Sequence, residues 1–143
     1  MSAFLANHEV MDLFTPGDHG STFGGNPLAC TVANSVLDII AKKKFFKELN
    51  SKANFLYNEL EKIKNENINI IEEIRGQCFL LGIKCKINNL ILIDALRKNG
   101  LLVVGASENV IRLLPPLNIK KTEIIEAIKI LKKTCTDLGL TKK

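Results

Sequence analysis

The hydrophobic pattern of this chain changes period after Asn65, and that change most constrains its fold. Before it, apolar residues recur every three to four positions, which is typical of helices that bury one face. After it, short apolar runs are separated by glycine, proline and asparagine, as in strands joined by turns. The order is helices first, then β-β-α-β-β-α. It predicts an α+β fold with a short, mostly antiparallel sheet covered by helices.

The ends of the elements follow from local signals. Asn26 is a good N-cap and Pro27 suits the first helical position, whereas Gly100 is expected to stop a later helix. The expected helices are Ala3–Phe14, one starting at Pro27 whose apolar face carries Leu28, Val32, Val36, Ile39 and Ile40, then Lys44–Asn65, Leu90–Asn99 and Thr122–Leu138. The expected strands are Asn69–Ile74, Cys78–Lys86, Leu101–Val104 and Val110–Leu114, with a turn over residues 75–77.

Size and residue usage exclude several classes of protein. A chain of 143 residues is the size of one domain, and 46% apolar residues are ordinary for a globular one. It contains no apolar run long enough for a membrane span, and residues 1–9 lack the features of a secretory signal, so we expect a cytoplasmic protein. The cysteines are widely spaced and there are two histidines. We therefore expect free thiols and no metal site.

The net charge of +5 raises the question of nucleic-acid binding. Arginine is scarce, being present only at Arg75, Arg97 and Arg112, and aromatic residues make up 6% of the chain. Nucleic-acid surfaces favour arginine for two-point contacts with phosphates and bases. A solvated, lysine-rich surface is therefore the favoured interpretation, with neither nucleic acid nor membrane as a partner.

The loop His19–Pro27 is rich in glycine and hydroxyl groups and leads into a helix. Glycines let backbone N–H groups approach a ligand, Ser21 and Thr22 supply hydroxyls, and a helix N-terminus attracts anions. A phosphate or carboxylate would suit such a loop. The alternative is a tight, solvated connection with an ordinary N-cap. The loop is not of the Walker type, because the GxxxxGK[ST] pattern does not occur.

Two arginines are further candidates for binding an anion. Arg112 lies in the middle of an expected strand among apolar neighbours, where a guanidinium needs a partner. That partner is either a carboxylate of the chain, in a structural ion pair, or the carboxylate of a ligand. Arg75 and Gly76 are interpreted as an exposed arginine and a turn glycine. The cysteines lie in apolar runs, as core residues do, and no nucleophile-and-base set can be identified.

The stretch Phe14–Cys30 resembles the signature of class III, fold type I aminotransferases that use pyridoxal 5'-phosphate. Within that family, the branch that acts on acetylornithine is the most similar, and ornithine aminotransferases are close to it. Residues 74–82 resemble a strand pair of the family's small C-terminal domain. Residues 109–117 resemble the strand that carries its substrate-binding arginine. The resemblance covers essentially the whole chain in order.

The resemblance implies roles for three residues. The residue matching Thr22 binds the cofactor phosphate across a dimer interface, and Ser21 lies beside it in the same loop. The arginine matching Arg112 binds the α-carboxylate of the amino-acid substrate. It further implies amino transfer between acetylornithine- or ornithine-type amino acids and 2-oxoglutarate, as in arginine biosynthesis. Residues 1–43 would be the end of the large cofactor domain with an interdomain helix, and residues 44–143 the small domain.

One catalytic group of the family has no match in this chain. The lysine that forms the Schiff base lies just upstream of the residues matching Met1–Ala6, so the chain resembles a C-terminal fragment without it. We therefore expect this chain alone to be inactive and not to hold the cofactor covalently. It would need an upstream, lysine-bearing partner or form a homo-oligomer through the apolar face that begins at Leu28. The alternative is a non-catalytic remnant that acts as a phosphate-binding or dimerising module.

Overall fold

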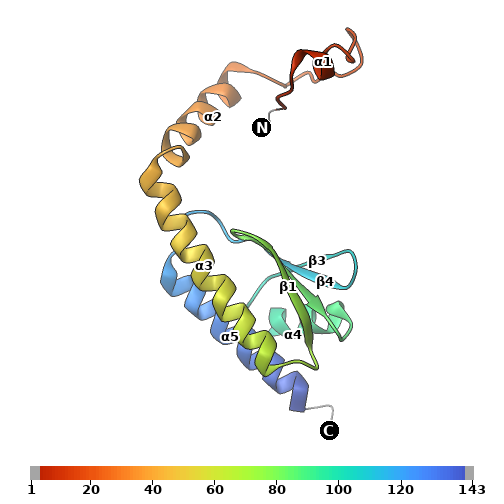
Figure 1. Ribbon diagram of the computed structural model, residues 1–143, viewed down its shortest axis with the longest axis vertical. Coiled ribbons are helices and arrows are strands. Elements are labelled where there is room, and N and C mark those ends of the chain that lie inside the picture. Colours follow the sequence, from red (N-terminus) through yellow and green to blue (C-terminus); the bar gives the residue numbers. More distant parts are fainter. Residues whose placement is uncertain (1–3, 141–143) are drawn as a thin grey trace. The chain divides into compact units, whose positions relative to one another are not determined.

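The computed structural model describes residues 4–140. The chain divides into two compact units, with the boundary in the sequence between Phe46 and Lys47. The first unit holds two helices, α1 (His8–Met11) and α2 (Pro27–Ile40), and the first residues of α3 (Lys43–Glu66). The second holds the rest of α3 and every later element (Figure 1). The expected boundary of 43/44 lies close to this division. The assignment of the two parts to domains of an enzyme stays a prediction.

Helix α1 is much shorter than the expected Ala3–Phe14, whose first residue lies outside the described part of the chain. Asn7 is the N-cap of this helix, and its side-chain oxygen accepts the N–H of Val10 at 3.1 Å. None of its residues is buried. Most helices are stabilised by packing of a buried face, and α1 has none, so no packing energy favours a longer helix here.

Helix α2 begins as expected, with Pro27 at its first turn and Asn26 as N-cap. The Asn26 side chain accepts the N–H of Ala29 at 3.0 Å. Leu28, Val32 and Val36 on the expected apolar face are exposed, and Ile40 is half-buried.

The second unit contains a four-stranded antiparallel sheet in the order β1-β2-β4-β3 (Figure 1). The strands are β1 (Ile71–Gln77), β2 (Leu80–Cys85), β3 (Val104–Ala106) and β4 (Val110–Leu113). Its helices besides α3 are α4 (Asn89–Lys98) and α5 (Lys121–Leu140), which bury their apolar residues against one face of the sheet. The α+β expectation is confirmed.

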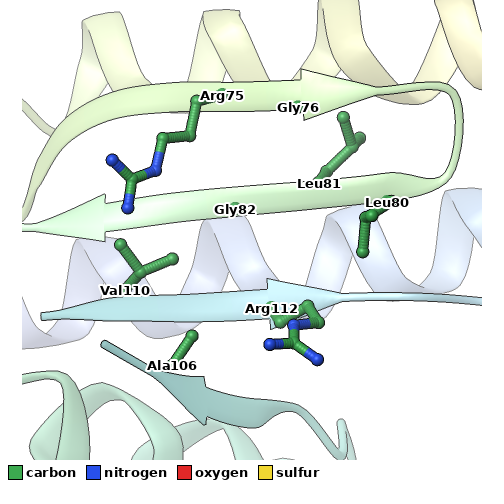
Figure 2. A pocket seen from close by; sticks show the side chains of 8 residues that line it. All are labelled: Arg75, Gly76, Leu80, Leu81, Gly82, Ala106, Val110 and Arg112. Atoms are coloured by element: carbon green, nitrogen blue, oxygen red, sulfur yellow. The ribbon is translucent and has the colours of Figure 1, made fainter. Parts of the chain in front are cut away.

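The helix-covered face of the sheet forms the core. Alternate residues of β2, namely Leu81, Ile83 and Cys85, are buried there together with Ile111 of β4. The opposing side chains come from the apolar stripes of the helices: Leu49, Ala53, Leu56, Leu60, Ile63, Leu92, Leu96, Ile124, Ile128, Leu131 and Cys135. Each fully buried aliphatic side chain contributes about 1.5–3 kcal/mol. The opposite face of the sheet is the one that Figure 2 views, with helices behind it.

The hairpin of β1 and β2 turns later than the sequence pattern predicts. Arg75 and Gly76 lie within β1, paired with Gly82 and Leu81, and the turn residues are Cys78 and Phe79. The expectation of a turn at residues 75–77 is therefore wrong. Phe79 is 1% exposed, so burial of this ring draws the turn residue into the core.

Strand β3 also differs from the expected Leu101–Val104. Helix α4 ends in a Schellman motif, in which Gly100 (φ +88°) and Leu101 donate their N–H groups to Arg97 and Leu96 carbonyls. The backbone N–H of Leu101 is therefore used to end α4 and does not pair with another strand. Pairing with β4 instead involves Val104, Gly105 and Ala106.

Candidate functional site

The candidate residues belong to two separate units. Ser21 and Thr22 lie in the first unit and Arg112 in the second.

Arg112 lies in the middle of β4 with its side chain exposed on the open face of the sheet. A structural ion pair was the alternative explanation for this arginine. Among residues 4–140, however, no carboxylate pairs with it and no side-chain hydrogen bond holds its guanidinium. The alternation along β4 places Ile111, and not Arg112, against the helices, so the Arg112 side chain is exposed. The guanidinium is thus available to a ligand.

The other two arginines are both paired. The Arg75 guanidinium lies 2.9 Å from the Glu108 carboxylate, and that of Arg97 lies 2.8 Å from Asp94. Both pairs are exposed to solvent, so each contributes at most about 1 kcal/mol to stability.

A cleft of about 520 Å³ lies over the open face beside Arg112 (Figure 2). It is lined by residues from all four strands: Arg75, Gly76, Leu80, Leu81, Gly82, Ala106, Val110 and Arg112. Its two charged lining groups are both guanidiniums, so the cleft favours an anionic ligand. Sequence reasoning did not place Arg75 in this cleft, because it assigned that residue to a turn.

Gly82 keeps the centre of the cleft open. It pairs with Arg75 on one side and with Arg112 on the other, so these three residues form one cross-strand row. A Cβ at position 82 would lie 3.0 Å from Cγ1 of Val110 and 3.5 Å from Cγ of Arg75. Any side chain there would occupy the space between the two arginines. A glycine inside an alternating strand was the signal that could have revealed this close approach.

The three-residue turn between β3 and β4, Ser107–Asn109, is anchored on both faces of the sheet. Glu108 (φ +60°) holds Arg75 on the open face. Asn109 (φ +61°) uses its side-chain amide to bind three backbone groups: it donates to the carbonyls of Cys85 (2.6 Å) and Ile87 (2.8 Å) and accepts the N–H of Asn89 (2.8 Å). Positive φ is uncommon for residues other than glycine, and asparagine tolerates it best.

The loop before α2 is exposed and internally hydrogen-bonded. The Ser21 hydroxyl accepts the N–H of Gly24 at 3.0 Å, which leaves its own hydrogen free to be donated. The Thr22 hydroxyl makes no hydrogen bond within the described part of the chain. Gly20 and Gly25 have open space where a side chain would be. These donors fit the phosphate of pyridoxal phosphate. At the N-terminus of α2, the N–H of Ala29 is already bound by the Asn26 side chain, so the groups of the loop would make most of the contacts with the phosphate.

Other candidate chemistry is limited. Within residues 4–140, no cluster of His, Cys, Asp and Glu has the geometry of a metal site. No helix of that range is long and apolar enough to cross a membrane. Burial raises the pKa of the Cys85 thiol to about 11 and that of Cys135 to about 12. Such thiols are poor nucleophiles at neutral pH. Cys30 and Cys78 are half-buried.

Comparisons with known proteins agree with these observations. The family model described as Aminotransferase class-III matches residues 1–135. Acetylornithine aminotransferase 1 of Bradyrhizobium diazoefficiens is 39% identical over 139 residues, which cover 97% of this chain and 34% of that protein. The ornithine aminotransferase of Staphylococcus carnosus is 40% identical over 133 residues, covering 93% and 33%.

A solved structure gives the same result in three dimensions. The crystal structure of acetylornithine aminotransferase from Elizabethkingia anophelis matches with a TM-score of 0.78 at 38% identity, covering 93% of this chain and 34% of that one. The chain thus spans about a third of the length of the relatives it matches.

Proposed function

The chain belongs to the Aminotransferase class-III family, and on that premise we propose that it forms the C-terminal part of an aminotransferase for acetylornithine- or ornithine-type amino acids, with 2-oxoglutarate as the acceptor. The names of its relatives support this substrate class. Under this proposal, residues 1–43 complete the large domain and residues 44–143 form the small domain.

Arg112 binds the α-carboxylate of the amino-acid substrate in this account. The observation that carries the assignment is its unpaired guanidinium beside an open cleft. A planar guanidinium can hold a carboxylate through two parallel hydrogen bonds, which fixes the orientation of the substrate as well as its position. Gly82 provides the space that the rest of the substrate needs at this point of the sheet.

Ser21 and Thr22 bind the cofactor phosphate through their hydroxyl hydrogens in this account. The family depends on pyridoxal phosphate, which supplies an electron sink for reactions at the α-carbon of amino acids. The two hydroxyls would hold the phosphate end of that cofactor. The support is the open glycine-rich backbone around the two hydroxyls.

The chain alone is not expected to transfer amino groups. The family's Schiff-base lysine lies upstream of the residues that match Met1–Ala6, and none of the lysines here resembles it. That lysine normally serves as the covalent partner of the cofactor and as the proton carrier. Purified chain, supplied with pyridoxal phosphate, an ornithine-type donor and 2-oxoglutarate, should release no product amino acid above a cofactor-only control. Steady turnover by the chain alone would overturn the proposal of inactivity.

A non-catalytic module is the second candidate, and the surface of α2 favours it. Leu28, Val32 and Val36 are 76%, 55% and 47% exposed, an apolar face suited to self-association. Sedimentation across a range of concentrations, with and without inorganic phosphate, tests this candidate. A monomer at every concentration, with no phosphate bound, would exclude it.

A further inference from the structure

We propose that Asn109 is a positioning residue for Arg112: its side-chain amide fixes where along β2 the short strand β4 pairs, and so keeps the guanidinium beside Gly82. The proposal rests on the carboxylate-binding role proposed for Arg112. It concerns a residue three positions away, on the other side of the sheet from the cleft.

The hydrophobic pattern alone selects the face of β4 but not its place along β2. Sliding β4 by one residue would turn Arg112 toward the helices. That register is strongly disfavoured, because it would bury an unpaired guanidinium charge. Sliding it by two residues keeps every side chain on its present face. The residues around Arg112 are apolar on both sides, so this second slip is not opposed by the pattern.

A slip of two residues would remove Arg112 from the cleft. Each residue advances a strand by about 3.3 Å, so the guanidinium would move by about 6.6 Å along β2. It would then lie opposite Leu80 or Lys84 instead of Gly82, where side chains occupy the space. The four residues of β4 and the three of β3 form too short a ladder to resist such a shift strongly.

The Asn109 side chain supplies the missing constraint. It joins the start of β4 to the end of β2 through the Cys85 carbonyl, to the following connection through the Ile87 carbonyl, and to α4 through the N–H of Asn89. The Asn89 side chain returns a hydrogen bond to the Val110 carbonyl at 3.0 Å. All these partners would be misplaced in a slipped register. A buried backbone group that loses its partner costs about 1–3 kcal/mol, so three such bonds hold one register firmly.

Asn109→Gly is the informative variant, because glycine accepts the positive φ while removing the amide. Asn99→Ala is the matched control. The Asn99 side chain also makes two hydrogen bonds, to the Ala95 carbonyl and the Thr134 hydroxyl, but these partners belong to α4 and α5 and not to β4. Both variants and the wild-type chain should be compared for urea stability, for the Gly82–Arg112 pairing by nuclear Overhauser effects, and for glutarate affinity by the shift of the Arg112 side-chain N–H.

We expect Asn109→Gly to weaken glutarate binding at least fivefold and to lose or split the Gly82–Arg112 cross-strand signals. Asn99→Ala should keep the wild-type glutarate affinity and the cross-strand signals, although its urea stability is similar to that of Asn109→Gly. Unchanged cross-strand signals in folded Asn109→Gly would overturn the positioning role. If wild type and Arg112→Gln bind glutarate equally, the proposed function of Arg112 fails, and the cross-strand signals still decide the positioning role independently.

Discussion

Arg75 on β1 and Arg112 on β4 lie in one cross-strand row of the sheet, on either side of Gly82, but only Arg75 has an acidic partner among the described residues. The Arg75 side chain passes beside the glycine, since a Cβ at position 82 would lie 3.5 Å from Cγ of Arg75, and its guanidinium lies 2.9 Å from the Glu108 carboxylate. The row thus contains one neutralised and one available guanidinium. This asymmetry makes Arg112 the group that meets a ligand.

Filling the centre of the row should block the cleft. Gly82→Ala places a methyl group 3.0 Å from Cγ1 of Val110, so the neighbours must shift slightly, at a cost of about 1 kcal/mol. Glutarate affinity, measured by titration, should fall at least threefold. The control is Gly139→Ala in α5, where the new methyl group meets no atom within 4 Å and should leave binding unchanged. Equal affinity in Gly82→Ala and wild type would contradict the assignment of the cleft.

Releasing Arg75 should have the opposite effect. Glu108→Gln removes the carboxylate that pairs with Arg75, and both side chains are well exposed, so stability should change by less than about 1 kcal/mol. The cleft would then hold two unneutralised guanidiniums. Glutarate should bind a few-fold more tightly at low salt, and the gain should shrink as the salt concentration rises. Weaker binding in the variant would show that Arg75 does not share the cleft.

The backbone at Gly76 should tolerate no side chain. Its φ is +118°, and a Cβ would lie within 2.1 Å of the Leu80 carbonyl oxygen across the hairpin. Gly76→Ala should therefore cost about 3 kcal/mol or more, because backbone atoms of both strands must move. Gly100→Ala is the comparison, since it shares a positive φ but has open space, and should cost about 1 kcal/mol. Urea unfolding measures both, and equal losses would contradict the close packing of the hairpin.

The buried thiols should make the fold sensitive to alkali. Folding raises the pKa of Cys85 from 9.0 to about 11 and that of Cys135 from 9.0 to about 12, chiefly by burial. The folded chain therefore keeps these protons at a pH where the unfolded chain has lost them. The free energy of unfolding should be unaffected by these groups below about pH 8 and fall as pH rises from about 9 toward 12.

Thiol labelling checks the same burial directly. Ellman's reagent at pH 8 should modify the half-buried Cys30 and Cys78 first, and Cys85 and Cys135 only at the rate of unfolding. Rapid labelling of all four thiols in the folded chain would show that the core is not closed around α5.

Local signals sufficed for the ends of the longer helices but not for α1 or for the sheet. Asn26 with Pro27 located the start of α2, and Gly100 located the end of α4, because a cap depends on neighbours in the sequence. Strand β3 was misplaced because Leu101 closes α4, and the turn at Cys78 because Phe79 is drawn into the core formed by distant parts of the chain.

The sequence identified the main residue of the candidate site, but it did not predict how the residues around it are arranged. The resemblance singled out Arg112, and its exposure follows from the alternation that buries Ile111. The participation of Arg75 required the true hairpin register, which no local pattern supplies. The role of Asn109 required the connection after β2 to lie beside the β3–β4 turn.

The most direct test of the account is a chimera in which this chain replaces the matching third of acetylornithine aminotransferase 1 from Bradyrhizobium diazoefficiens, which supplies the remaining two thirds of an enzyme. The chimera should transfer amino groups from acetylornithine to 2-oxoglutarate. Arg112→Lys, which keeps the charge but loses the two-point contact, should raise KM at least tenfold. A folded, cofactor-loaded chimera that is inactive, or one whose KM is indifferent to Arg112, would contradict the account.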